Sequence, residues 1–125
     1  MIDVRLSEQA RDQLIRLKRA TGIKTWNVLC RWAFCVSLAE EETIGDAFDS
    51  NESAIEMRWD VFGGEYQHAY QAILADECHK SGQEVNDRNI GRLVRQHVQR
   101  GANLLANKYK ITSIVDLIHL VGCRL

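Results

Sequence analysis

The sequence predicts a mainly α-helical protein that forms a single domain over residues 1–125, with at most one or two short strands. Three observations support this. None of the 125 residues is proline, apolar residues recur at helical spacing through most of the chain, and apolar–polar alternation is confined to two short stretches. The composition, 46% hydrophobic and 26% charged, is that of a globular domain with a core of its own.

The first 22 residues predict a short strand followed by a capped helix. Apolar residues at positions 2, 4 and 6 alternate with Asp3 and Arg5, which is typical of a strand. Ser7 is placed to cap the next helix, and Thr21-Gly22 ends that helix.

A second helix is predicted over residues 25–39, and it is unusually apolar. From residue 26 onward only Asn27, Arg31 and Ser37 are polar, so this helix must be buried on most of its faces. Strand, helix and apolar helix in this order are typical of a ribbon-helix-helix unit, a fold that usually completes its core with a second chain and often contacts DNA. We therefore expect an oligomer, and the alternative is a central helix in a compact monomer. The expected interface residues are Trp26, Leu29, Trp32 and Phe34.

The second half of the chain is predicted to be helical after an acidic loop over residues 40–53. Residues 55–61 alternate like a strand, and the alternative is a helical turn that brings Ile55, Trp59 and Phe62 together. Helices are then expected over residues 65–80, from a cap at Asn86 or Asp87 to residue 108, and over residues 113–121 after a cap at Thr112.

Two glycines lie inside the long predicted helix, where each costs roughly 1 kcal/mol of helix stability relative to alanine. Close packing against another helix would explain both Gly91 and Gly101.

The net charge is only −1, but its distribution along the chain is uneven. Residues 1–35 carry seven Lys/Arg against three Asp/Glu, residues 36–85 carry two against twelve, and residues 86–125 carry seven against two. Basic ends of this kind tolerate a polyanion, and the acidic middle offers them an internal or intermolecular partner.

The basic residues predict contacts with DNA phosphates. One group surrounds the turn between the first two helices, a second follows one face of the long helix at spacings i, i+4 and i+7, and one arginine lies on the first strand. The candidates are Arg16, Lys18, Arg19 and Lys24, then Arg88, Arg92 and Arg95, and Arg5. The alternative is a solvated face, or pairing with the acidic middle. Base readout is poorly supported, because the strand offers only Asp3 and Arg5.

Catalytic and metal-binding patterns are weak, and we expect no catalytic residues, no metal site and no cofactor. Cys78-His79 has no second pair nearby, and the four cysteines form no C-x-x-C pair. His97 is expected to be a core histidine rather than a ligand. The N-terminus has no signal-peptide core and no apolar run reaches membrane-spanning length, so we expect a cytoplasmic protein without a membrane partner.

The stretch VRLSEQARDQLIRLKRATGIKTWNVLCRWAFCVSL resembles the N-terminal signature of the DndE family, and the likeness continues through the Gly-Gly turn and LVRQHVQRGANLL. DndE is the small subunit of bacterial DNA phosphorothioation systems. The resemblance implies a DNA-binding, tetrameric accessory subunit with affinity for nicked duplex, working beside an ATPase-like subunit and the subunits that carry the sulfur chemistry. It also implies phosphate contacts by Lys18, Arg19 and Lys24. The alternatives are a ribbon-helix-helix repressor and a scaffold that docks the ATPase partner.

Overall fold

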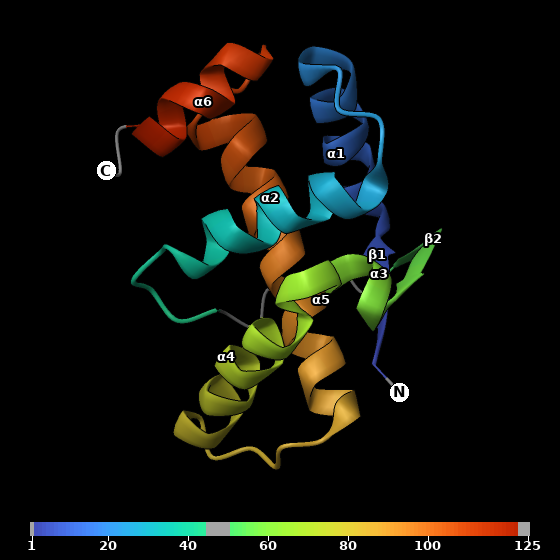
Figure 1. Ribbon diagram of the computed structural model, residues 1–125, viewed down its shortest axis with the longest axis vertical. Coiled ribbons are helices and arrows are strands. Elements are labelled where there is room, and N and C mark those ends of the chain that lie inside the picture. The colour runs from blue at the N-terminus through green and yellow to red at the C-terminus, as the bar shows by residue number, and fades with distance from the viewer. Residues whose placement is uncertain (1, 45–50, 123–125) are drawn as a thin grey trace.

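The computed structural model describes residues 2–44 and 51–122 and is mainly α-helical, as predicted (Figure 1). The long helix α5 (Asp87–Asn103) forms the centre, and α2 (Trp26–Leu38) crosses it. At one end lie α1 (Glu8–Thr21) and α6 (Ile114–Gly122), and at the other end α4 (Gln67–Lys80) packs beside α5. A π-helical segment, Leu104–Lys108, continues α5 towards α6. Within the described residues, no helix has the length and apolar character needed to cross a membrane.

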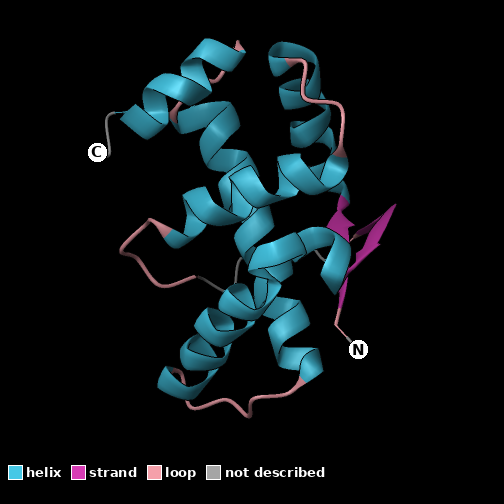
Figure 2. Cartoon of the chain, viewed as in Figure 1, coloured by secondary structure: helices cyan, strands magenta, loops and turns pink. Residues whose placement is uncertain are grey.

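A two-stranded antiparallel ribbon lies beside the helices (Figure 2). The predicted first strand is confirmed as β1 (Asp3–Ser7), and its partner is β2 (Glu52–Arg58) of the same chain. The sheet is therefore completed without a second chain, unlike the ribbon of the ribbon-helix-helix fold. Val4 and Leu6 point from β1 into the core and are no more than 1% exposed.

The second predicted strand is only partly right, because β2 ends at Arg58. A short helix, α3 (Trp59–Gly63), and a 3-10 turn, Gly64–Tyr66, follow it. The change of period has a packing reason: helical spacing buries both Trp59 and Phe62, at 6% and 0% exposure. The strand and the helical turn were each right for one half of the segment.

Local hydrogen bonds fix the helix ends. The Ser7 hydroxyl accepts from the Ala10 N–H at 3.1 Å, as predicted for the cap of α1, and Gly22 ends that helix in the left-handed region at φ 78°. Asn86 caps α5. The cap predicted for the last helix is wrong by one residue, because Ser113 rather than Thr112 accepts from the first turn.

The closest contact between helices is at Gly101. A Cβ built there would lie 1.7 Å from the carbonyl oxygen of Ala33, so α5 and α2 meet backbone to backbone. The close packing predicted for Gly101 is confirmed. The same prediction is wrong for Gly91, which faces β1 rather than a helix. A Cβ built at Gly91 would lie 3.7 Å from the carbonyl oxygen of Asp3, an ordinary van der Waals distance.

The apolar helix α2 is covered largely by its own chain. Phe34 packs edge-on against Phe62 and Tyr70, with ring centroids 5.3 and 5.0 Å apart, and is 0% exposed. Leu29 is equally buried. The structure therefore corrects the expectation that Leu29 and Phe34 form a subunit interface, since neither side chain reaches the surface. Trp26 and Trp32 remain half-buried.

Candidate nucleic-acid interface

A group of basic side chains surrounds the turn that joins α1 to α2. We call it the turn cluster: Arg16, Lys18, Arg19 and Lys24. Arg16 and Arg19 project from the last turns of α1, and Gly22 reverses the chain so that Lys24 stands just before α2. In residues 2–44 and 51–122, Arg16, Arg19 and Lys24 are exposed and form no ion pair or side-chain hydrogen bond.

Lys18 is held differently from the rest of the turn cluster. Its Nζ lies 5.6 Å from the ring centroid of Trp26, which is the geometry of a cation–π contact. Thr25 begins α2 without a side-chain cap, so the first N–H groups of α2 remain available beside Lys24. The positive end of the α2 dipole thus adds to the charge of the turn cluster.

The other predicted phosphate contacts are mostly engaged within the chain. Arg5 donates to Glu56 at 2.6 Å and lies 3.7 Å from Glu52, while Arg95 lies 3.9 Å from Glu52. The alternative that arginines pair with the acidic middle therefore holds for Arg5 and Arg95.

The three arginines of α5 do not form one group. Arg92 donates to Gln83 in the loop after α4, whereas Arg95 is directed towards β2. Arg88 is exposed near the start of the helix. The spacing i, i+4 and i+7 places the three residues on one side of α5, but the contacts of Arg92 with Gln83 and of Arg95 with Glu52 direct their guanidinium groups to different elements.

The outer face of the ribbon balances its own charge. Arg5 stands opposite Glu56, and Asp3 stands opposite Arg58. Cross-strand pairs of opposite charge stabilise a ribbon and leave few free groups for base edges. This agrees with the poor support for base readout in the sequence.

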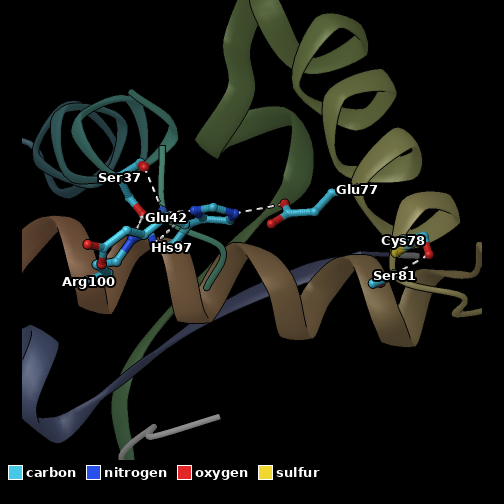
Figure 3. A network of polar contacts seen from close by, with 7 residues as sticks. All are labelled: Ser37, Glu42, Glu77, Cys78, Ser81, His97 and Arg100. Atoms are coloured by element: carbon cyan, nitrogen blue, oxygen red, sulfur yellow. Dashed lines mark hydrogen bonds and ion pairs between the residues drawn. The ribbon is translucent and has the colours of Figure 1, made fainter. Parts of the chain in front are cut away.

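A polar network centred on buried Ser37 and His97 joins α2, α4 and α5 (Figure 3). The Ser37 Oγ lies 2.8 Å from His97 Nδ1, and His97 Nε2 lies 2.8 Å from a carboxylate oxygen of Glu77. Arg100 donates to both the hydroxyl and the carbonyl oxygen of Ser37, each at 2.7 Å, and to the carbonyl of Glu42 at 2.8 Å. Because Ser37 is 0% exposed, the hydroxyl of this serine–histidine–carboxylate sequence does not reach the protein surface. His97 is a satisfied core histidine, as predicted.

The cysteines of the described residues are mostly ordinary core groups. Cys30 and Cys78 are buried, and burial raises the pKa of the Cys30 thiol to about 12. Burial, followed by the charge of Glu77, also raises the pKa of Cys78. His79 is exposed and does not share the environment of Cys78. Within the part of the chain that the structure describes, no three His, Cys, Asp or Glu side chains gather as a metal site.

The exposed side of α2 forms a shallow hollow of about 310 Å³. Its lining residues are Val28, Arg31, Trp32 and Cys35. Arg31, for which the sequence predicts no role, donates to the carbonyl oxygens of Phe62 at 2.5 Å and Val61 at 3.2 Å. The sequence signal for this contact is that Arg31 is the only charged residue in residues 26–38. The surface left by these contacts is apolar and uncovered.

Comparisons with known proteins agree with this arrangement. A model of the family described as DNA sulphur modification protein DndE matches residues 3–113. The crystal structure of DndE from Escherichia coli B7A, described as involved in DNA phosphorothioation modification, superposes with a TM-score of 0.66 at 26% identity. That match covers 84% of this chain and 96% of the other. Among curated proteins, none matches the sequence significantly. Since the family match spans most of the sequence, the chain belongs to the DndE family of DNA sulphur modification proteins.

Proposed function

We propose that this protein is a non-catalytic accessory subunit of the DNA phosphorothioation machinery and binds duplex DNA through its phosphate backbone at the turn cluster. The observation that supports the proposal most directly is the set of exposed basic groups around the α1–α2 turn that have no acidic partner among the described residues. Membership of a DNA sulphur modification family supplies the biological setting. Acting on DNA places the protein in the cytoplasm.

The charge balance of the chain makes the turn cluster distinctive. With a net charge of −1, nearly every basic group has an acidic counterpart somewhere in the sequence. Three of these basic groups form ion pairs of 2.6 to 2.9 Å: Arg5 with Glu56, Arg58 with Asp60 and Lys80 with Asp76. Among the described residues, Arg16, Arg19 and Lys24 of the turn cluster have no acidic partner, so they can bind phosphate oxygens without breaking an ion pair.

The test is duplex binding measured by fluorescence anisotropy at several salt concentrations. In the variant R19E/K24E, two free cations of the turn cluster become anions, and we expect affinity at about 50 mM salt to fall at least tenfold. The matched control is R58E/K80E, which reverses two exposed charges that already have acidic partners, Asp60 and Asp76.

The control variant should lose much less affinity than the turn-cluster variant. The salt dependence should also become shallower by about 1 to 2 in log–log slope when two phosphate contacts are removed. Equal losses in both variants would mean that only net charge matters, and the turn cluster would then not be the binding site.

We further propose that the protein works as a homo-oligomer, a tetramer by the family resemblance, and favours nicked over intact duplex. The uncovered hollow beside Trp32, together with half-buried Trp26, supports an interface on α2. Light scattering gives the oligomeric mass, and competition between nicked and intact duplexes of one sequence gives the preference. An ATPase-like partner subunit is tested by co-purification after nuclease treatment. A monomer that binds both duplexes equally would contradict the first two proposals.

A further inference from the structure

Two arginines from different elements meet one carboxylate on the ribbon. Arg5 of β1 and Arg95 of α5 lie 3.7 and 3.9 Å from the two oxygens of Glu52, and Arg5 also donates to Glu56 at 2.6 Å. The family model spans all four residues, but nothing in the proposed turn-cluster site involves them. A carboxylate between two guanidinium groups occupies the position that a phosphate takes between two arginines.

Arg95 is incompletely satisfied by this arrangement. Its Nη1 is attracted to Glu52 from 3.9 Å, which is too far for a hydrogen bond, and its buried Nε has no hydrogen-bond partner among the described residues. Buried donors without a partner are rare in proteins and call for an explanation. A phosphate offers more acceptor oxygens than one carboxylate and is a better match for two guanidinium groups.

The carboxylates are easily displaced. Glu52 and Glu56 expose 58% and 42% of their side chains, and ion pairs at such positions contribute little to stability. Their removal leaves the ribbon's inner contacts in place, since Ser53 donates to the Leu6 carbonyl from the buried side of β2.

We propose that Glu52 and Glu56 are internal competitors for a second DNA-phosphate site formed by Arg5 and Arg95. DNA held at the turn cluster gains this second contact only by displacing the two carboxylates, which limits the affinity of the free protein for duplex. The inference rests on the proposed DNA-binding function. It adds a second phosphate contact and a pair of carboxylates that lower the affinity for duplex.

The test compares E52Q/E56Q with wild type in duplex titrations between about 50 and 200 mM salt. Affinity at low salt should rise about 3- to 10-fold, and the log–log salt slope should steepen by about 1 to 2. The charge-matched control is E65Q/E84Q, which changes two exposed carboxylates that form no ion pair with Arg5 or Arg95 among the described residues and should alter both quantities less. E52Q alone, which removes the carboxylate that Arg5 and Arg95 share, serves as the second variant should the double one unfold.

The decisive step adds R5Q and R95Q to the E52Q/E56Q protein, which should return affinity and slope to wild-type values or below. A gain that persists without these arginines, or one matched by E65Q/E84Q, would overturn the competitor role alone. Wild-type binding that is lost in R19E/K24E would still uphold the proposed function. Failure of every form to bind duplex at low salt would overturn both.

Discussion

Replacement of Gly101 by alanine tests the central packing contact of the fold. The added Cβ would lie 1.7 Å from the Ala33 carbonyl oxygen and 2.3 Å from its carbon, and both atoms belong to the backbone of α2. No side-chain rotation can relieve this clash. The two helices must separate until the Cβ lies at least 3.0 Å from that oxygen, the lower limit for real Cβ contacts.

The sign of the stability change follows from two opposing terms. Alanine is the better helix former, and this alone would add up to about 1 kcal/mol. Separation of α2 from α5 loosens the core around Leu29 and Val98, which are both 0% exposed, and overpacking of this kind costs about 1–3 kcal/mol or more. Because the contact is with backbone, we expect the upper end, for a net loss of about 2–3 kcal/mol.

Gly91 provides the matched control in the same helix. Its added Cβ meets only the Asp3 carbonyl oxygen at 3.7 Å, an ordinary van der Waals distance. Gly91→Ala should therefore show the propensity gain with no clash and raise stability by about 0.5–1 kcal/mol. Urea unfolding followed by far-UV circular dichroism measures both variants. A Gly101→Ala protein as stable as wild type would refute the backbone contact between α5 and α2.

Four further predictions concern the core, the polar network and the exposed face of α2. Phe34→Ala should lower the free energy of unfolding by about 3–5 kcal/mol, measured in a thermal or urea melt. Trp32→Ser should leave the fold intact but lower the oligomeric mass measured by light scattering. His97→Ala should cost about 2–4 kcal/mol, because it removes a buried ring together with its hydrogen bonds to Ser37 and Glu77, and a melting temperature no lower than that of wild type would contradict the role of the network. In the Trp32→Ser protein, iodoacetamide at a pH of about 8 should modify exposed Cys35 before Cys30, whose pKa is raised to about 12; mass spectrometry of peptides decides the order.

Features set by neighbouring residues could be predicted from the sequence. The hydroxyl of Ser7 caps a helix that begins one residue later, and Gly22 supplies the left-handed end of the same helix. The pairing of β1 with β2 could not be predicted, because the alternation in residues 55–61 indicates a strand but does not show which strand it pairs with. A strand's pairing partner is a tertiary property, decided by how the intervening helices fold.

The same limit applies to the candidate site. Charge and position predict Arg16, Lys18, Arg19 and Lys24 as candidates, and these residues lie close together in the sequence. Whether a basic residue is free depends on distant carboxylates, and the pairing of Arg5 with Glu56 joins residues 51 positions apart. The apolar character of α2 likewise predicts that the helix is buried. It does not indicate whether the same chain or a partner chain covers it.

Helix α2 contributes to the core, to the proposed subunit interface and to the proposed DNA site, and it therefore links the assembly to DNA binding. Its inner face is covered by α5, its outer face carries Trp32, and its first turn follows Lys24 directly. Trp26 and Trp32 are six residues apart, which is about 9 Å along a helix. An interface built on Trp32 therefore brings the turn clusters of neighbouring copies near one another, where they can bind one duplex together with a raised effective concentration. Loss of assembly in Trp32→Ser should then weaken duplex binding although no basic residue has changed, and unchanged affinity in a monomeric variant would separate the two surfaces.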